Sequence, residues 1–313
     1  MAGKLAKVTD VTDCATVDAM LQKSVTDWDI RTVTAWVDPN DSSQGVIDPG
    51  GYRALVRPDT HQALAFVGER FHANNHRAQL HTLDTLVESG DLVPTSVSVW
   101  DNGAILAYQF RAPGLDVTVR GKDMVSPLLT LAFAYGSKLA DTSFFADFRW
   151  FCKNQMGMVA KVNDKESRCK HRGGIVDRFG DILAGRISQL SGELSGRYNT
   201  MRRMTEAPLQ RGRALAEYFG EVLGLTPEEL DGALNIPPNK LRGDAGKIPE
   251  ILDCYLAEDS AEDGTVWRAY NAVTRYETHH AGRNEATRNR RMLLGSGGAV
   301  ASRAWDIAAR IAA

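Results

Sequence analysis

The stretch RWFCKNQMGMVAK, which begins at Arg149, places four side chains with useful chemistry within six positions. The cationic side chains of Arg149 and Lys153 can bind phosphate, and the Asn154 amide can reach both a backbone and a base edge. Cys152 becomes a nucleophile only as a thiolate, and a cysteine beside an aromatic residue is more often a small buried side chain. We therefore expect no catalytic residue here. We predict a basic helix that buries Cys152 and presents Arg149, Lys153 and Asn154 to a polyanion.

Further basic residues follow this stretch and extend the predicted surface. A dense row of cations attracts a phosphate backbone because binding releases condensed counterions. The alternative is a solvated loop without a specific role. In the nucleic-acid interpretation the phosphate contacts continue with Lys161, Lys165, Arg168, Lys170 and Arg172, and Arg57, Arg120 and Lys122 extend them from the predicted strands.

Two other motifs carry weaker signals. His279 and His280 are adjacent, so on a helix their side chains point about 100° apart and cannot share a metal as residues four positions apart do. The GSGG sequence at residues 295–298 lacks the preceding strand and the following Lys-Ser or Lys-Thr of phosphate-binding loops. It indicates a break between two helices, with a weak potential to touch phosphate. We expect no bound metal and no cofactor.

Length and composition indicate a folded protein with one large domain or two modest ones. The chain has 313 residues, of which 43% are hydrophobic and 24% charged. Its start has no apolar run like a signal-peptide core, and no apolar stretch is long enough to cross a bilayer. We expect a cytoplasmic protein without a membrane partner. The four cysteines are widely spaced, which argues against disulfides and a structural zinc site.

Charge is distributed unevenly along the chain. Residues 149–213 contain fourteen Lys and Arg against six Asp and Glu, whereas residues 217–263 contain three against twelve. From residue 268 to the end the balance is positive again, eight against three. The basic blocks are either nucleic-acid surfaces or ordinary solvated helix faces. Because an acidic face of one subunit can meet a basic face of the next, we predict a homo-oligomer.

Periodicity predicts an α+β fold with an antiparallel sheet, packed helices and a largely helical C-terminal half. Residues 1–45 lack clear periodicity and predict an irregular N-terminal arm. Residues 46–173 predict an α+β core, in which YRALVR and ALAFVG form a hairpin and a helix follows Asn74-Asn75. The Asn102-Gly103 pair predicts a second tight hairpin.

Residues 174–313 predict a helical region. Apolar residues recur at intervals of three to five from Ile175 to Met201, which indicates a long amphipathic helix. Thr226 followed by Pro227 and Glu229 predicts a capping box at the start of another helix.

Three separated stretches resemble a known family. RWFCKNQMGMV is similar to an R-x-x-C-x-N-T-L element of the phage/plasmid-like proteins that are catalogued only as a domain of unknown function. LVRPDTHQALAFVG resembles their N-terminal hairpin, and TVWRAYNAVTRYETHH with GSGGAVASRAWDIA resembles their C-terminal pattern. Gln155-Met156 departs from the usual Thr-Leu. The resemblance covers roughly residues 50 to 312 and implies an origin on a mobile element, without a settled activity.

The predicted order of elements is also similar to that of phage single-strand annealing proteins of the Red-beta and RecT type. This similarity implies a protein that binds single-stranded DNA along a basic groove, assembles into a ring or filament, and promotes annealing or homologous recombination. Fold-level analogy alone does not establish an activity. The alternatives are an enzyme that acts on nucleic acid or a nucleotide, and an interaction protein of a mobile element without a DNA role.

Overall fold

The computed structural model describes residues 6–35, 50–136, 140–150, 154–158, 168–169, 194–259 and 261–313. The chain divides into two compact units. The first contains Met1–Pro113, Leu129–Phe144 and Lys161–Ser188, and the second contains Gly114–Leu128, Phe145–Ala160 and Gln189–Ala313. The two units are therefore interleaved along the chain, whereas the sequence predicted consecutive regions.

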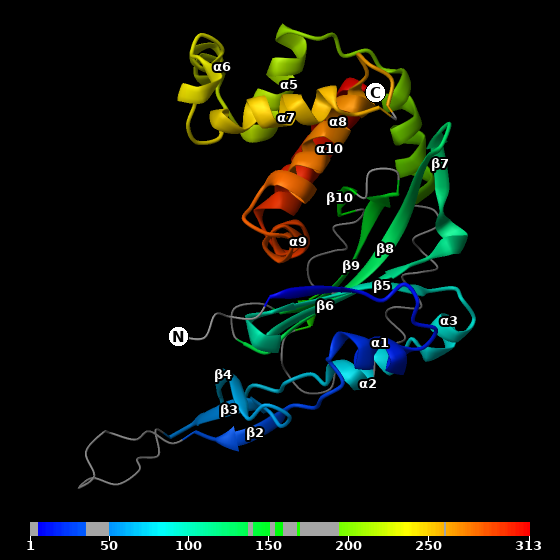
Figure 1. The fold of residues 1–313 in the computed structure, drawn as a ribbon, viewed down its shortest axis with the longest axis vertical. Coiled ribbons are helices and arrows are strands. Elements are labelled where there is room, and N and C mark those ends of the chain that lie inside the picture. The colour runs from blue at the N-terminus through cyan, green and yellow to red at the C-terminus, as the bar shows by residue number, and fades with distance from the viewer. Residues whose placement is uncertain are drawn as a thin grey trace, which may run out of the picture. The chain divides into compact units, whose positions relative to one another are not determined.

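The larger sheet has the strand order β1-β5-β6-β8-β9-β10, with β7 paired to β8 and β11 paired to β9 (Figure 1). Its strands are β1 (Lys7–Asp10), β5 (Val93–Trp100), β6 (Ile105–Arg111), β7 (Val117–Arg120), β8 (Asp123–Ala134), β9 (Asp141–Arg149), β10 (Asn154–Met158) and β11 (Arg168–Cys169). β8 and β9 each run from one unit into the other. With a helical C-terminal region, this sheet confirms the predicted α+β class.

The hairpin predicted at Asn102-Gly103 is confirmed by the antiparallel pairing of β5 with β6. The connection is one 3-10 turn, Asp101–Gly103, in which Asn102 and Gly103 have φ values of 61° and 99°. Asparagine and glycine adopt such values at low cost. Val99 pairs with Leu106 beside this turn, and both are buried.

The helix predicted to start at Arg149 is wrong. β9 ends at Arg149, and β10 pairs with it antiparallel, with Asn154 opposite Arg149. Most side chains of β9 are buried, Phe144 and Phe145 among them, so its apolar run reflects a buried strand. Apolar runs of this length do not distinguish a helix from a buried strand.

The N-terminal segment is more regular than the predicted arm. β1 pairs with β5, α1 (Val17–Ser24) follows, and β2 (Arg31–Thr34) enters a second sheet. Thr16 caps the start of α1, since its hydroxyl accepts a hydrogen bond from the Ala19 backbone N–H at 3.1 Å. Both strands have only four residues, which is too short for alternation to be visible in the sequence.

The helix predicted after Asn74-Asn75 is present as two short helices, α2 (His76–His81) and α3 (Asp84–Glu88). The Asn75 side chain caps α2 by accepting from the backbone N–H groups of Arg77 and Ala78.

The C-terminal region is helical, as predicted. Residues 194–206 form a helix that buries Leu194, Tyr198 and Met201, and the earlier part of the predicted long helix lies outside the described residues. The other helices are α5 (Arg213–Leu223), α6 (Pro227–Leu234), α7 (Ile248–Leu256), α8 (Val266–Arg275), α9 (Glu285–Leu294) and α10 (Ser296–Ile311), with a π-helical turn at Tyr276–His280 after α8. The capping box at Thr226 and Glu229 is confirmed by both of its hydrogen bonds.

The helix break predicted at the GSGG sequence falls at Gly295, between α9 and α10, and the two glycines in the first turn of α10 allow close packing. A Cβ atom on Gly298 would clash with the carbonyl oxygen of Met292, and one on Gly297 would lie 3.0 Å from Glu277 Oε2. The buried carboxylate of Glu277 thus lies against the first turn of α10, where exposed N–H groups favour negative charge. Arg291 donates to the same oxygen at 2.8 Å. The chain's own carboxylate therefore occupies this helix end.

Candidate functional site

A small three-stranded sheet in the first unit combines exposed aromatic side chains with a pocket. Its order is β2-β3-β4, so β3 (Tyr52–Arg57) lies between β2 and β4 (Gln62–Gly68) (Figure 1). The predicted hairpin of β3 and β4 is confirmed by their antiparallel pairing. Val33 pairs with Ala54 and Ala54 pairs with Phe66, so these three side chains lie on one face of the sheet.

This face, hereafter the exposed face, consists of Arg31, Val33, Tyr52, Ala54 and Phe66, because residues two positions apart in a strand share a face. Tyr52 is 56% exposed, Phe66 68% and Val33 41%, whereas Ala54 between them is buried. Large exposed apolar side chains gathered on one face mark an interaction surface. Two exposed aromatic side chains and an arginine on one sheet face can contact planar ligands by stacking and by charge.

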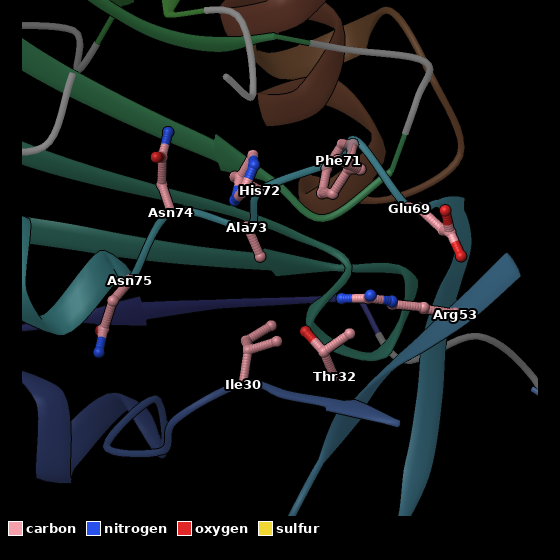
Figure 2. A pocket seen from close by; sticks show the side chains of 9 residues that line it. All are labelled: Ile30, Thr32, Arg53, Glu69, Phe71, His72, Ala73, Asn74 and Asn75. Atoms are coloured by element: carbon pink, nitrogen blue, oxygen red, sulfur yellow. The ribbon is translucent and has the colours of Figure 1, made fainter. Parts of the chain in front are cut away.

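The opposite face of the same sheet borders a pocket of about 220 Å³ (Figure 2). Thr32 and Arg53 come from β2 and β3, and the segment from Glu69 to Asn75 closes the other side. Figure 2 shows the Arg53 side chain reaching from its strand into the space beside Thr32. The small sheet therefore presents two different chemical surfaces.

Asn74 and Asn75 fix the segment that closes the pocket. The Asn74 amide donates to Asp141 Oδ2, and Asp141 Oδ1 accepts from the Ala134 backbone N–H at 2.8 Å. The Asn75 amide donates to Asp29 at 3.1 Å while its oxygen caps α2. The pocket wall is thus tied to the larger sheet and to the segment before β2.

A buried histidine follows the same segment. His76 Nε2 lies 2.8 Å from the Thr26 carbonyl oxygen, and Nδ1 lies 2.5 Å from the Tyr135 hydroxyl. Because a carbonyl only accepts, Nε2 carries the proton and Nδ1 accepts from Tyr135. Burial lowers the His76 pKa from 6.5 to about 4, so the ring is neutral at physiological pH.

Arg57, predicted to contact phosphate, is buried and anchors the small sheet instead. Its Nε and Nη2 donate to the two carboxylate oxygens of Asp59 at 3.0 and 2.6 Å, and Nη1 donates to the Asn102 carbonyl at 3.0 Å. The guanidinium lies 4.4 Å from the ring centroid of Trp28. A Cβ atom on Gly103 would lie 3.0 Å from both Arg57 and Trp28, which explains the glycine there.

Arg149 is likewise fully buried, so it cannot present its charge to a polyanion. Its Nε donates to Asp123 Oδ1 at 2.5 Å and its Nη2 to Asp123 Oδ2 at 2.8 Å. Nη1 donates to Glu258 at 3.0 Å, and the Trp267 indole N–H donates to Asp123 at 2.8 Å. All four residues belong to the second unit. The guanidinium at the end of β9 therefore holds β8, α8 and the residues after α7 together.

Two other predicted site residues are exposed. For the rest, either the side chain or the whole residue is not described. Arg120 and Lys122 are exposed at the turn between β7 and β8, where Arg120 pairs with Glu262 at 2.7 Å. Asn154 lies in β10 and Arg168 in β11, and their side chains are not described. The remaining predicted positions lie outside the described residues: Cys152, Lys153, Lys161, Lys165, Lys170 and Arg172.

Metal binding and membrane insertion find no support in the part of the chain that the structure describes. His279 and His280 are exposed at the end of the π-helical turn. No group of three or more His, Cys, Asp or Glu in the described ranges could hold a metal ion. None of the described helices combines the length and the hydropathy that crossing a bilayer requires.

The exposed face was not predicted from the sequence, although the alternation of residues that forms it is present there. Alternation in YRALVR places Tyr52 and Ala54 on one side of a strand, but it does not show which side faces solvent. A sheet needs only one buried face, and in this hairpin Leu55 and Val67 form it. Phe66 and Tyr52 then remain on the open side.

Comparison with known proteins gives a family but no activity. The family model described as "Domain of unknown function (DUF932)" matches residues 63–294. No curated protein and no solved structure matches the chain.

Proposed function

The chain belongs to the family described as a domain of unknown function (DUF932), and since that membership assigns no activity, we propose that it is a single-stranded DNA-binding protein. In this proposal it originates from a phage or plasmid, acts in the cytoplasm of the host cell, and promotes strand annealing or homologous recombination. The observation that carries the proposal is the exposed face of the small sheet, with Tyr52 and Phe66 open to solvent and Arg31 on the same face.

Aromatic rings on a sheet face favour a single strand over a duplex. Every unpaired base has a flat face that can stack on an aromatic ring, and such stacking contributes about 1 to 3 kcal/mol per base. The bases of a duplex are stacked on one another and cannot reach Tyr52 and Phe66. Because stacking tolerates any base, the proposed binding has little sequence preference.

Charge around the face supports the same ligand. Arg31 lies on the exposed face and is itself exposed. Within the described residues its guanidinium makes no hydrogen bond or ion pair, whereas Arg57 and Arg77 of the same unit are paired with carboxylates. An arginine that has no partner among the described residues can bind a backbone phosphate or a base.

Self-association is the second part of the proposal. The excess of acidic residues over 217–263 and of basic residues on both sides favours contacts between copies in which unlike faces meet. Such heterologous contacts close into rings or continue as filaments. Light scattering with and without single-stranded DNA tests this part, and a monomer of 34.3 kDa under both conditions contradicts it.

The decisive experiment measures binding of a fluorescent single-stranded oligonucleotide by anisotropy, with a duplex of the same sequence as the comparison. The wild type is expected to prefer the single strand. The Tyr52→Ala/Phe66→Ala variant is expected to lose at least about tenfold in affinity, since one lost stacking contact already corresponds to about that factor. Leu256→Ala, which removes another half-exposed apolar side chain in the second unit, is the matched control.

Two results contradict the proposal. One is equal affinity of the wild type and the double variant for the single strand. The other is a change of oligomeric state in the double variant without a change in DNA affinity, which identifies the exposed face as a contact between copies.

A further inference from the structure

The pocket in Figure 2 is chemically separate from the exposed face. Its sheet side is formed by Thr32 and Arg53, which alternate along β2 and β3 with Arg31, Val33 and Tyr52 of the exposed face. Residues of opposite parity in a strand point to opposite sides of the sheet. A ligand in the pocket therefore meets none of the side chains that carry the proposed function.

Arg53 supplies a cation that has no partner among the described residues. In the described ranges its guanidinium makes neither a hydrogen bond nor an ion pair, although it belongs to the lining of the pocket. Figure 2 shows the guanidinium directed toward the middle of the pocket. A guanidinium offers five N–H donors in a planar fork, which matches the oxygens of a phosphate. The Thr32 hydroxyl and the His72 ring lie on the same lining and add further hydrogen-bonding groups.

Glu69 supplies an acceptor at the rim. It lines the pocket together with Arg53, yet the two form no ion pair. In Figure 2 the Glu69 carboxylate points away from the Arg53 guanidinium. A carboxylate accepts hydrogen bonds from hydroxyl and amino groups and repels a bare anion. An open cation and an open carboxylate in one pocket fit a ligand that has a phosphate at one end and a donor group at the other.

The lining also has apolar residues beside Asn74 and Asn75, and the space is small. Ile30, Phe71 and Ala73 give the pocket an apolar part beside its polar groups. Its volume of about 220 Å³ lies below the range of about 300 to 1,000 Å³ that holds drug-sized ligands. The pocket therefore has room for one small ligand with a flat apolar part, a hydroxyl or amino donor, and an anionic group.

From this combination we propose that the pocket binds the phosphate and sugar of a single nucleotide. Arg53 and Thr32 hold the phosphate, Glu69 accepts from a sugar hydroxyl or a base amino group, and the base contacts Phe71. The same chemistry is present in a free mononucleotide and in the 5′-phosphorylated end of a strand. Both sources are included in the test.

The test uses the full chain and isothermal titration with deoxyadenosine 5′-monophosphate, compared with deoxyadenosine and with inorganic phosphate. The nucleotide is expected to bind more tightly than either comparison compound. Arg53→Gln is expected to weaken nucleotide binding at least tenfold. Arg70→Gln is the matched control, because Arg70 is an exposed arginine next to Glu69 that does not line the pocket. Glu69→Gln is expected to reduce the preference for the nucleotide over inorganic phosphate.

A second arm compares oligonucleotides with and without a 5′-phosphate. Tighter binding of the phosphorylated strand that is lost in Arg53→Gln supports the pocket with a strand end as its ligand. Binding of the free nucleotide that is lost in the same variant supports it with a mononucleotide.

The proposal is overturned if neither the free nucleotide nor the 5′-phosphate produces binding that depends on Arg53. The Tyr52→Ala/Phe66→Ala variant separates this outcome from a failure of the proposed function. That variant is expected to keep its nucleotide affinity even where it loses affinity for the strand.

Discussion

Arg149 and Asp123 form a buried bidentate ion pair, in which Nε and Nη2 of the guanidinium donate to the two carboxylate oxygens at 2.5 and 2.8 Å. This geometry satisfies both oxygens of Asp123 and leaves Nη1 for Glu258. Because its side chain is fully buried, Arg149 stabilises the fold and does not reach a ligand.

Replacing Arg149 by methionine is expected to destabilise the second unit by about 3 to 5 kcal/mol, because two carboxylates then remain buried without their cation. Denaturant titration followed by tryptophan fluorescence measures the change. Arg120→Gln is the control, since its exposed pair with Glu262 contributes less than about 1 kcal/mol. A stable Arg149→Met protein with reduced DNA affinity would restore Arg149 to the nucleic-acid surface and contradict this interpretation.

His76 makes the first unit sensitive to acid. Its pKa is about 4 in the folded chain and 6.5 in the reference state, so the unfolded chain binds the extra proton between these values. Stability is therefore complete above about pH 6.5, decreases as the pH falls, and has lost about 3 kcal/mol below pH 4. Unfolding at a series of pH values should show this loss in the wild type and a smaller one in His76→Gln. An identical pH dependence in both proteins would assign the loss to other groups.

Glycine substitutions test the packing of α10 on α9. Gly298→Ala is expected to cost about 1 to 3 kcal/mol, since the new methyl group meets the Met292 carbonyl oxygen and the backbone must move. Gly232→Ala in α6 is the control, because nothing lies within 4 Å of its Cβ position, and alanine there should stabilise the helix by up to about 1 kcal/mol. Melting temperatures should shift in opposite directions. A neutral Gly298→Ala would show that the two helices are not in close contact.

Gly103→Ala should loosen the anchor of the small sheet. Its φ of 99° disfavours alanine, and the added methyl group presses on Arg57 and Trp28. We expect a loss of about 1 to 3 kcal/mol of stability and faster hydrogen exchange in β3 and β4. Gly121→Ala, also at positive φ but with open space around it, separates the cost of the backbone from that of the lost contact. Equal exchange in both variants would contradict the role of Gly103 as part of the anchor.

Local features of the fold could be predicted from the sequence because they depend on neighbouring residues. The turn at Asn102-Gly103 and the cap of Thr226 and Glu229 each need only a few adjacent positions. The strand at Asn154–Met158 could not, since its partner β9 decides between strand and helix. The strands of the N-terminal segment, β1 and β2, could not be predicted either, because they depend on pairing with β5 and β3.

The candidate site residues could be predicted only in part, for the same reason. Cationic residues are visible in a sequence, but their exposure is not. Arg149 donates to Glu258, 109 positions away, and Arg57 donates to Asn102, 45 positions away, as well as to the nearby Asp59. The distant acceptors cannot be read from the neighbouring sequence. Arg53 carries the same charge and has no such partner in the described residues. Only the three-dimensional arrangement separates the anchors from the available cations.

The interleaving of the two units determines how activity can be mapped to parts of the molecule. Because β8 and β9 each contribute to both units, a fragment that ends at any single position between Pro113 and Gln189 lacks residues that belong to at least one of them. Truncated proteins would therefore report loss of folding rather than loss of a site. Point substitutions on individual faces, tested in the full-length chain, are the means of dissecting this protein.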